Sequence, residues 1–164
     1  MFKIGDKVAH PLHGAGTISE IENKRINGVN KSYYVMHIPK GDMRVMIPVE
    51  SCEVVGIRPI IEKTKAMEIL QAIPDLEISE ENNWNRRYRE NMQRLKSGRL
   101  DEVSRVVKSL MLRERERGLS TGERKMLNTA KQILLSELAL ATGSTFDALD
   151  RALSAALQGT GDVL

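Results

Sequence analysis

Two histidines and a cysteine are the first residues of the chain whose types could support metal binding or nucleophilic chemistry. His10 and His13 stand three positions apart, and Cys52 is the single cysteine. Imidazole and thiolate groups are zinc ligands, but this spacing matches no common zinc site and no fourth ligand is evident. The segment His-Pro-Leu-His-Gly is more typical of a turn that carries surface histidines. We therefore expect no bound metal and no cofactor.

Motifs for other enzymatic chemistry are also missing from the sequence. It contains neither the glycine-rich phosphate-binding loop nor the dinucleotide-binding glycine pattern. No Ser/His/Asp arrangement and no pair of carboxylates suited to acid–base catalysis stands out. The sequence therefore predicts a protein that is not an enzyme.

Trp84 is the residue whose surroundings are most unusual. It is the only tryptophan, and its neighbours are polar or basic: Asn82, Asn83, Asn85, Arg86 and Arg87. An indole can wedge between or stack on nucleic-acid bases, while adjacent guanidinium groups neutralise phosphates. The alternative is a tryptophan that opens a helix and packs into a bundle with Tyr88. Since tryptophan is usually well buried, the residues alone favour this second interpretation.

Positive charge is concentrated in one part of the chain. The net charge is +3, but residues 84–131 hold 14 Lys and Arg against 6 Asp and Glu, a local excess of 8. Such a surface attracts polyanions such as nucleic acid, although a solvated helix surface explains it equally well. The run 86–89 is almost purely basic, whereas the run 113–117 alternates in sign and suggests a salt-bridged exposed face. Arg124 and Lys125 stand in a first helical turn, where positive charge is slightly unfavourable. This favours contact with a ligand, with tolerated surface charge as the alternative.

The elements that must position these residues differ between the two parts of the chain. Residues 1–58 alternate like short strands, as in the segment 33–38, and Asn27-Gly28 is typical of a tight hairpin. Four or five short strands there predict a small β-barrel of the SH3 or Tudor type. Residues 59–83 predict a short helix that Pro74 ends, followed by an acidic linker.

Residues 84–164 predict an all-helical domain, so that the expected fold class is α+β. Asn82 or Asn83 can cap a first helix, and Gly98 can end it. Apolar residues at helical spacing predict a second helix from Leu100 that closes at Gly118. Three further signals mark the remaining helices: the capping-box spacing of Ser120 and Glu123, a stop at Gly143, and an apolar stripe over 145–157.

The composition limits where the protein works. A lone cysteine fits a reducing compartment, and no apolar stretch is long enough for a signal peptide or a membrane span. We expect a cytoplasmic protein that does not enter membranes and that is a monomer.

Three segments together resemble the CarD/CdnL family of bacterial transcription regulators. They are MFKIGDKVAHPLHGAGTISEIE at residues 1–22, WNRRY at 84–88 and RERGLSTGERKML at 115–127. The similarity runs from Phe2 to about Leu157. The first segment alone is also similar to a module of the transcription-repair coupling helicase, but no helicase motif follows here.

The resemblance implies two binding surfaces. It implies a Tudor-like domain that binds the β subunit of RNA polymerase, partly by pairing with an edge strand. It also implies a helical domain on promoter DNA at the upstream edge of the transcription bubble, where a tryptophan wedges into the minor groove without reading sequence and slows bubble collapse. That tryptophan is Trp84 here, so the resemblance reverses the interpretation favoured by the residues alone.

The expected contacts follow from the matching positions. With Arg86, which flanks the tryptophan, the expected DNA-binding residues are Trp84, Arg86, Arg87, Arg89, Arg124 and Lys125. The expected polymerase-binding residues are Lys24, Ile26, Arg44, Val45, Met46 and Pro48. Some relatives carry an arginine at the position of Met46. Arg44 can substitute for it only if the strand alternates regularly, so that both side chains share one face.

Three hypotheses of function remain open on the sequence. The first is a polymerase-bound regulator that stabilises the open promoter complex. The second is a protein–protein adaptor of the transcription machinery whose basic face is merely solvated. The third is an enzyme with an unrecognised site around His10, His13 and Cys52.

Overall fold

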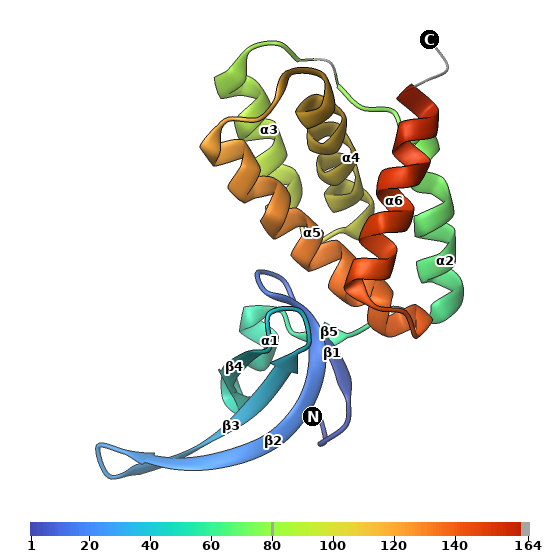
Figure 1. Ribbon diagram of the computed structural model, residues 1–164. Helices are drawn as coiled ribbons and strands as arrows, with labels where there is room; N and C mark the ends of the chain where they lie inside the picture. Colours follow the sequence, from blue (N-terminus) through green and yellow to red (C-terminus); the bar gives the residue numbers. More distant parts are fainter. Residues whose placement is uncertain (80, 162–164) are drawn as a thin grey trace.

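The computed structural model describes residues 1–79 and 81–161 and has an α+β architecture (Figure 1). An antiparallel sheet forms the N-terminal part, and a layer of helices forms the C-terminal part. The strands are β1 (Lys7–His10), β2 (Gly14–Ile26), β3 (Val29–Ile38), β4 (Met43–Pro48) and β5 (Arg58–Pro59). The α+β class expected from the sequence is therefore confirmed.

The sheet is not a closed barrel, contrary to the sequence-based prediction. Its strand order is β4-β3-β2-β1-β5, so that β4 and β5 form the two outer edges. A closed barrel would need β5 to pair with β4 as well as with β1. Both residues of β5 pair with β1, and β5 has no second strand partner in this sheet. One face of the sheet carries a small core made of Val8, Ile18, Tyr34, Met36, Ile38, Ile47, Cys52 and Ile57.

The hairpin between β2 and β3 forms at the predicted turn. Asn27 and Gly28 both have positive φ, 52° and 78°, as a two-residue turn of this kind requires. The pairing of β2 with β3 continues to Ile26 and Val29, whereas β4 pairs with β3 only as far as Tyr33. The hairpin therefore projects beyond the sheet as a two-stranded arm (Figure 1).

Apart from the short α1, which the sequence pattern did not predict, the helices begin and end close to the predicted residues. They are α1 (Cys52–Val55), α2 (Lys63–Ala72), α3 (Trp84–Lys96), α4 (Leu100–Arg117), α5 (Thr121–Thr142) and α6 (Phe146–Gly161), with 3-10 turns at Val49–Ser51 and Ile73–Asp75. The side chains of Asn83 and Ser120 cap α3 and α5 by accepting hydrogen bonds from the backbone N–H groups of Arg86 and Glu123. Gly143 ends α5 in the left-handed conformation.

The segment between the strands and α3 contributes to the helical core. Ala66 and Ile73 are buried in the same apolar cluster as residues of α4, α5 and α6. The ammonium group of Lys108 on α4 donates to the carbonyl oxygens of Pro74, at 2.6 Å, and Leu76, at 2.7 Å. These contacts hold the start of the expected linker against the helices, which the sequence pattern did not predict.

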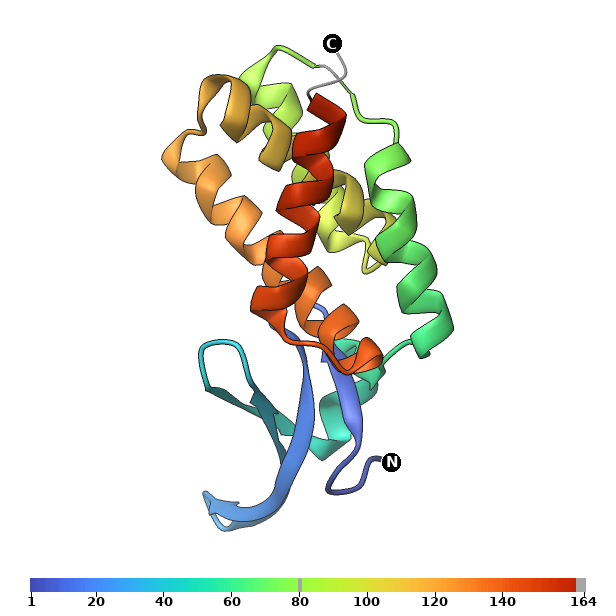
Figure 2. The same cartoon turned by 45° about the vertical axis from the view of Figure 1, so that its right-hand side comes forward.

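The sheet contacts the helical layer along α5. This helix lies against β2 (Figure 1, Figure 2). The backbone N–H of Ala15 donates to the hydroxyl of Ser136 at 2.8 Å. A Cβ atom at Gly14, whose φ is +94°, would lie 2.6 Å from the carbonyl oxygen of Gln132. Only glycine fits this approach without displacing α5.

A buried carboxylate completes this contact. The guanidinium of Arg58 on β5 donates two hydrogen bonds to Glu137 on α5, at 2.6 and 2.8 Å. The backbone N–H of Ile61 donates to the same carboxylate at 2.9 Å. The hydrogen bond from Arg58 to Glu137 raises the pKa of Arg58 above its ordinary value, against the effect of burial. We refer to Gly14, Ala15, Arg58, Ser136 and Glu137 as the joint.

His10 is buried beside the joint. Its Nδ1 accepts a hydrogen bond from the N–H of Leu12 at 3.0 Å, which requires an unprotonated nitrogen. It lines a cavity of about 60 Å³ shared with Arg58 and Glu137. Burial, and then the charge of His13, lowers the pKa of His10 from 6.5 to about 4.

We expect this histidine to make stability fall in mild acid. The lowered pKa favours the neutral form in the folded state, so its stabilisation is complete above the unfolded pKa of 6.5 and is lost toward pH 4. The free energy of unfolding should fall by about 2 kcal/mol between roughly pH 7 and pH 5 from His10 alone. Urea unfolding at both pH values checks this. An unchanged pH dependence in a His10→Gln variant would contradict the assignment.

Candidate functional site

Trp84 lies at the surface where two helices begin. It is the first residue of α3, is 43% exposed and is not one of the residues of the helical core. Its ring stacks on Tyr88, with centroids 5.0 Å apart and planes at 17°. Its Nε1–H donates to the hydroxyl of Ser120, the N-cap of α5, at 3.2 Å. Trp84 thus opens a helix and stacks on Tyr88, as the second interpretation has it, but it is not one of the buried core residues.

Arg87 does not lie on the basic surface to which the sequence analysis assigned it. The residue is 5% exposed. Its Nε donates to Glu123 at 2.9 Å, and its Nη2 donates to the other carboxylate oxygen at 3.3 Å. Its remaining Nη1 contacts the backbone carbonyl groups of residues 81 and 82. These donors are directed into the protein, so Arg87 is an internal ion-pair partner in this structure.

Helix geometry explains the burial of Arg87. It stands four residues before Asn91 and eight before Leu95, and both of these are buried on the inner face of α3. Because Arg87 stands between other basic residues in the sequence, its place in the spacing of the inner-face residues was not recognised.

Glu123 is the functional residue that the sequence analysis did not identify as part of the site. It is buried at the third position of α5. Burial alone would raise the pKa of Glu123, but the hydrogen bond and charge of Arg87, the charge of Arg113 and the Ser120 hydroxyl together hold that pKa below its usual range. The capping-box spacing to Ser120 was the signal that could have identified it.

Exposed cations stand on both of the helices that begin at this surface. Arg86, Arg89, Arg124 and Lys125 are all exposed. Arg86 lies loosely near Glu81 and Glu90, with nitrogen–oxygen distances of 3.7 and 3.8 Å. Within residues 1–79 and 81–161, the other three form no ion pair. The charges of Arg89, Arg124 and Lys125 are therefore available to an anionic partner.

The end of α4 adds two further arginines to this region. Arg113 and Arg117 line a hollow of about 260 Å³ together with Asn82 and Arg87 at the start of α3. Salt bridges within the run 113–117, which the alternating charges predicted, do not occur in the described part of the chain. The carboxylates of Glu81 and Glu116 line the same hollow, so its charge is mixed.

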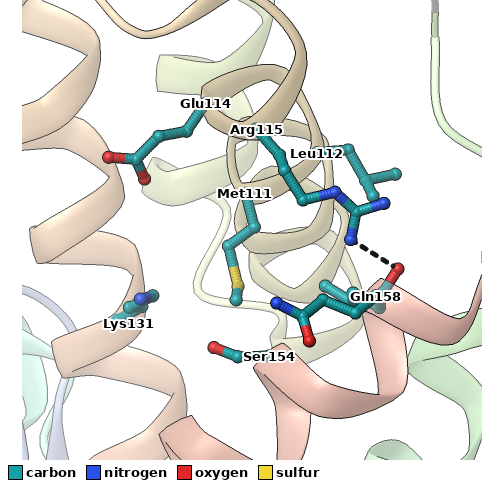
Figure 3. Close-up of a pocket in the computed structure, with 8 residues that line it drawn as sticks. Met111, Leu112, Glu114, Arg115, Lys131, Ser154 and Gln158 are labelled. Carbon is teal, nitrogen blue, oxygen red and sulfur yellow. Dashed lines mark hydrogen bonds between the residues drawn. The ribbon is translucent and has the colours of Figure 1, made fainter. Parts of the chain in front are cut away.

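A second hollow lies between α4, α5 and α6 and has a volume of about 250 Å³ (Figure 3). Its cations are already engaged. Arg115 donates to the carbonyl oxygen of Leu157 at 3.1 Å, and Lys131 pairs with Asp150 at 3.0 Å. With its positive charges satisfied internally, this hollow offers no evident anion site.

The expected polymerase-facing residues lie on the sheet, but not all on one face. The pairing of β3 with β4 is continuous over six residue pairs, so the side chains of β4 alternate regularly. Arg44 and Met46 are both exposed and share a face, whereas Val45 packs against the small core on the other. The condition under which Arg44 can replace an arginine at the Met46 position is met.

Neighbouring strands complete this face. The Lys24 ammonium lies 3.7 Å from the sulfur of Met46, and Arg44 lies 3.6 Å from Glu20 and 3.5 Å from Glu22. Ile26 is exposed near the tip of the two-stranded arm, and Pro48 ends β4. The structure thus brings Lys24, Arg44 and Met46 together, leaves Ile26 apart on the arm, and turns Val45 inward.

The described residues also lack the features of two other kinds of site. No cluster of three or more His, Cys, Asp or Glu side chains there is arranged to hold a metal ion. Over the same residues, no helix combines the length and apolar character needed to cross a membrane.

Comparison with known proteins gives matches along most of the chain. The family model described as "CarD-like/TRCF RID domain" matches residues 2–61, and the model "CarD, C-terminal domain" matches residues 65–154. A Bacillus subtilis (strain 168) protein described as "Putative transcription factor YdeB" is 35% identical over 145 residues, which cover 88% of this chain and 95% of that protein. The solution NMR structure of the 72-residue N-terminal domain of Myxococcus xanthus CarD is 25% identical and covers 36% of this chain and 79% of its own, with a TM-score of 0.32.

Proposed function

The chain belongs to the CarD/CdnL family, and from this membership we propose a transcription regulator that binds the β subunit of RNA polymerase and promoter DNA together. The sheet binds the polymerase, and the helical layer binds DNA at the upstream edge of the bubble. The proposed result is a more stable open complex. The protein performs no covalent chemistry in this role and acts as a monomer in the cytoplasm, where the polymerase works.

The observation that carries the proposal is the exposed Trp84 among free cations. A large apolar ring at the surface can insert at a distorted base step of the minor groove. Arg89, Arg124 and Lys125 flank it on two helices and have no internal ion-pair partner among the described residues. Because phosphate contacts position a protein without reading sequence, this surface is suited to a junction defined by shape.

A wedge can stabilise the open complex by differential binding alone. If the indole contacts only the melted or distorted junction, its binding energy favours the open state over the closed one. A difference of about 1.4 kcal/mol shifts that equilibrium tenfold. No sequence-specific contact is needed, so the protein can serve many promoters.

The sheet supplies features suited to the polymerase contact. β4 is an outer strand whose far side has no strand partner within the described residues. Such an edge can accept a strand from another protein through backbone hydrogen bonds. Arg44, Met46 and Lys24 then add side-chain contacts on one face, with Ile26 and Pro48 at its limits. We propose residues 1–58 as the polymerase-binding domain and 84–164 as the DNA-binding domain, connected by 59–83.

The joint gives the two surfaces a fixed relation. Hydrogen bonds from Ala15, Arg58 and Ile61 tie the strands to α5, whose N-terminus carries Arg124 and Lys125. A regulator anchored on the polymerase can therefore present Trp84 to DNA in one orientation. Preorganisation of this kind lowers the entropic cost of the second contact.

Salt dependence tests whether DNA is contacted at all. Affinity for a polymerase–promoter complex should fall steeply with salt, because Lys and Arg release counterions from phosphates. An Arg124→Gln/Lys125→Gln variant should reduce the log–log slope by about two relative to the wild type. Fluorescence titration at four salt concentrations measures this slope.

The matched control is Arg151→Gln, which removes one exposed arginine from α6, away from the tryptophan. It should leave the slope unchanged. A flat salt response of the wild-type protein would instead favour a protein–protein adaptor whose basic face is only solvated.

A further inference from the structure

The hydroxyl of Ser120 has all its hydrogen-bonding capacity in use, and one bond goes to Trp84. It accepts from the indole Nε1–H at 3.2 Å and from the backbone N–H of Glu123 at 3.2 Å. Its own O–H donates toward the Glu123 carboxylate at 3.4 Å. A serine hydroxyl offers two acceptor sites and one donor, so it couples the indole to the first turn of α5.

A buried ion pair fixes the position of that turn relative to α3. The Nε atom of Arg87 lies 2.9 Å from a carboxylate oxygen of Glu123, and both side chains are almost entirely buried. Arg87 belongs to α3, one turn after Trp84, and Glu123 lies one turn after Ser120 in α5. The ion pair therefore locks together the two helix starts that hold the tryptophan.

The rings themselves lie close to the backbone of α5. A Cβ atom added at Gly122 would lie 3.6 Å from Tyr88 and 3.9 Å from Trp84. These are ordinary van der Waals distances, so the stacked rings pack against the first turn of α5 at this position. The indole is thus held on three sides, by Tyr88, Gly122 and Ser120, while much of it stays exposed.

We propose that Ser120 is a positioning residue that holds the indole of Trp84 in its DNA-ready orientation before DNA is bound, with the Arg87–Glu123 pair as its support. The exposed tryptophan then loses little rotational freedom on insertion. The positioning of the ring stands on the free protein, whereas its benefit for the open complex rests on the proposed function. These two parts have separate readouts.

Fluorescence of the free protein tests the positioning. Trp84 is the only tryptophan, so its emission reports on this ring alone. Ser120→Gly removes the hydroxyl but keeps a residue that is acceptable at an N-cap. Ser120→Thr is the conservative control, because threonine also carries a hydroxyl. We expect Ser120→Gly to increase the amplitude of the fast, local part of the anisotropy decay about twofold, and Ser120→Thr to resemble the wild type. An unchanged decay in Ser120→Gly, with the fold intact by circular dichroism, would overturn the proposal.

The lifetime of open complexes tests the benefit. Ser120→Gly should shorten the protein-dependent extension of that lifetime by about two- to tenfold, and Ser120→Thr should retain most of it. If Ser120→Gly increases the motion of the Trp84 ring but extends the open-complex lifetime as much as the wild type does, the proposed benefit of positioning the ring in advance is overturned. If the wild-type protein gives no extension, the proposed function fails and the benefit fails with it, while the anisotropy result still decides whether Ser120 orients the ring.

Discussion

Replacing Arg58 with alanine should lower the free energy of unfolding by about 3–5 kcal/mol, the usual cost of breaking a buried ion pair by removing one partner. Replacing Glu137 with glutamine should cost clearly less. The asymmetry follows from burial, because the Glu137 side chain is 2% exposed and the Arg58 side chain is 39% exposed. Without its partner, the Arg58 guanidinium can be hydrated, whereas the Glu137 carboxylate without its partner stays buried as an uncompensated charge.

Urea unfolding of the two single variants and the double variant measures this asymmetry. The double variant Arg58→Ala/Glu137→Gln should recover part of the loss seen in Arg58→Ala, since no uncompensated charge is left. The control pair is Lys31–Glu50, which is exposed and 3.5 Å apart; Lys31→Ala should change stability by less than about 1 kcal/mol. Equal losses for Arg58→Ala and Glu137→Gln would contradict the account of the joint.

Replacing Arg87 with alanine should have the second large effect, a loss of about 3–5 kcal/mol. It would leave the buried Glu123 without its main partner and free α3 from the first turn of α5. Arg86→Ala, one residue earlier and exposed, should change stability by less than about 1 kcal/mol. Thermal unfolding of both variants checks the contrast.

The same pair of variants separates the two roles considered for Arg87. An internal ion-pair partner, once removed, lowers the melting temperature. A phosphate contact, once removed, lowers the salt dependence of binding by about one counterion and leaves the melting temperature unchanged. The second outcome would restore the role that the sequence analysis gave to Arg87 and contradict its burial.

Local signals made much of the fold predictable. The turn at Asn27-Gly28, the caps at Asn83 and Ser120, and the stop at Gly143 each depend on a few neighbouring residues with defined backbone preferences. Their bounds therefore agree closely with the structure. The exposure of Trp84 is consistent with its polar flanks, although the general burial of tryptophan pointed the other way.

Contacts between distant residues were not predictable from the pattern. Glu137 lies in an apolar stretch of α5, and its partner Arg58 is 79 positions earlier in the sequence. Whether the sheet closes depends on β5, which is only two residues long. The burial of Arg87 likewise depends on Glu123, 36 positions later. Periodicity identifies the inner face of one helix, but it does not identify the charged partner that another element supplies.

The lifetime of competitor-challenged open complexes, measured with the cognate polymerase on a ribosomal RNA promoter, tests the central claim most directly. The wild-type protein should lengthen this lifetime, and Trp84→Ala should lose most of the effect while keeping its fold, because the side chain lies outside the core. Trp84→Ala should still bind the polymerase through the sheet. An unchanged lifetime with the wild-type protein, despite demonstrated binding to the polymerase, would contradict the wedge and leave only a protein–protein adaptor.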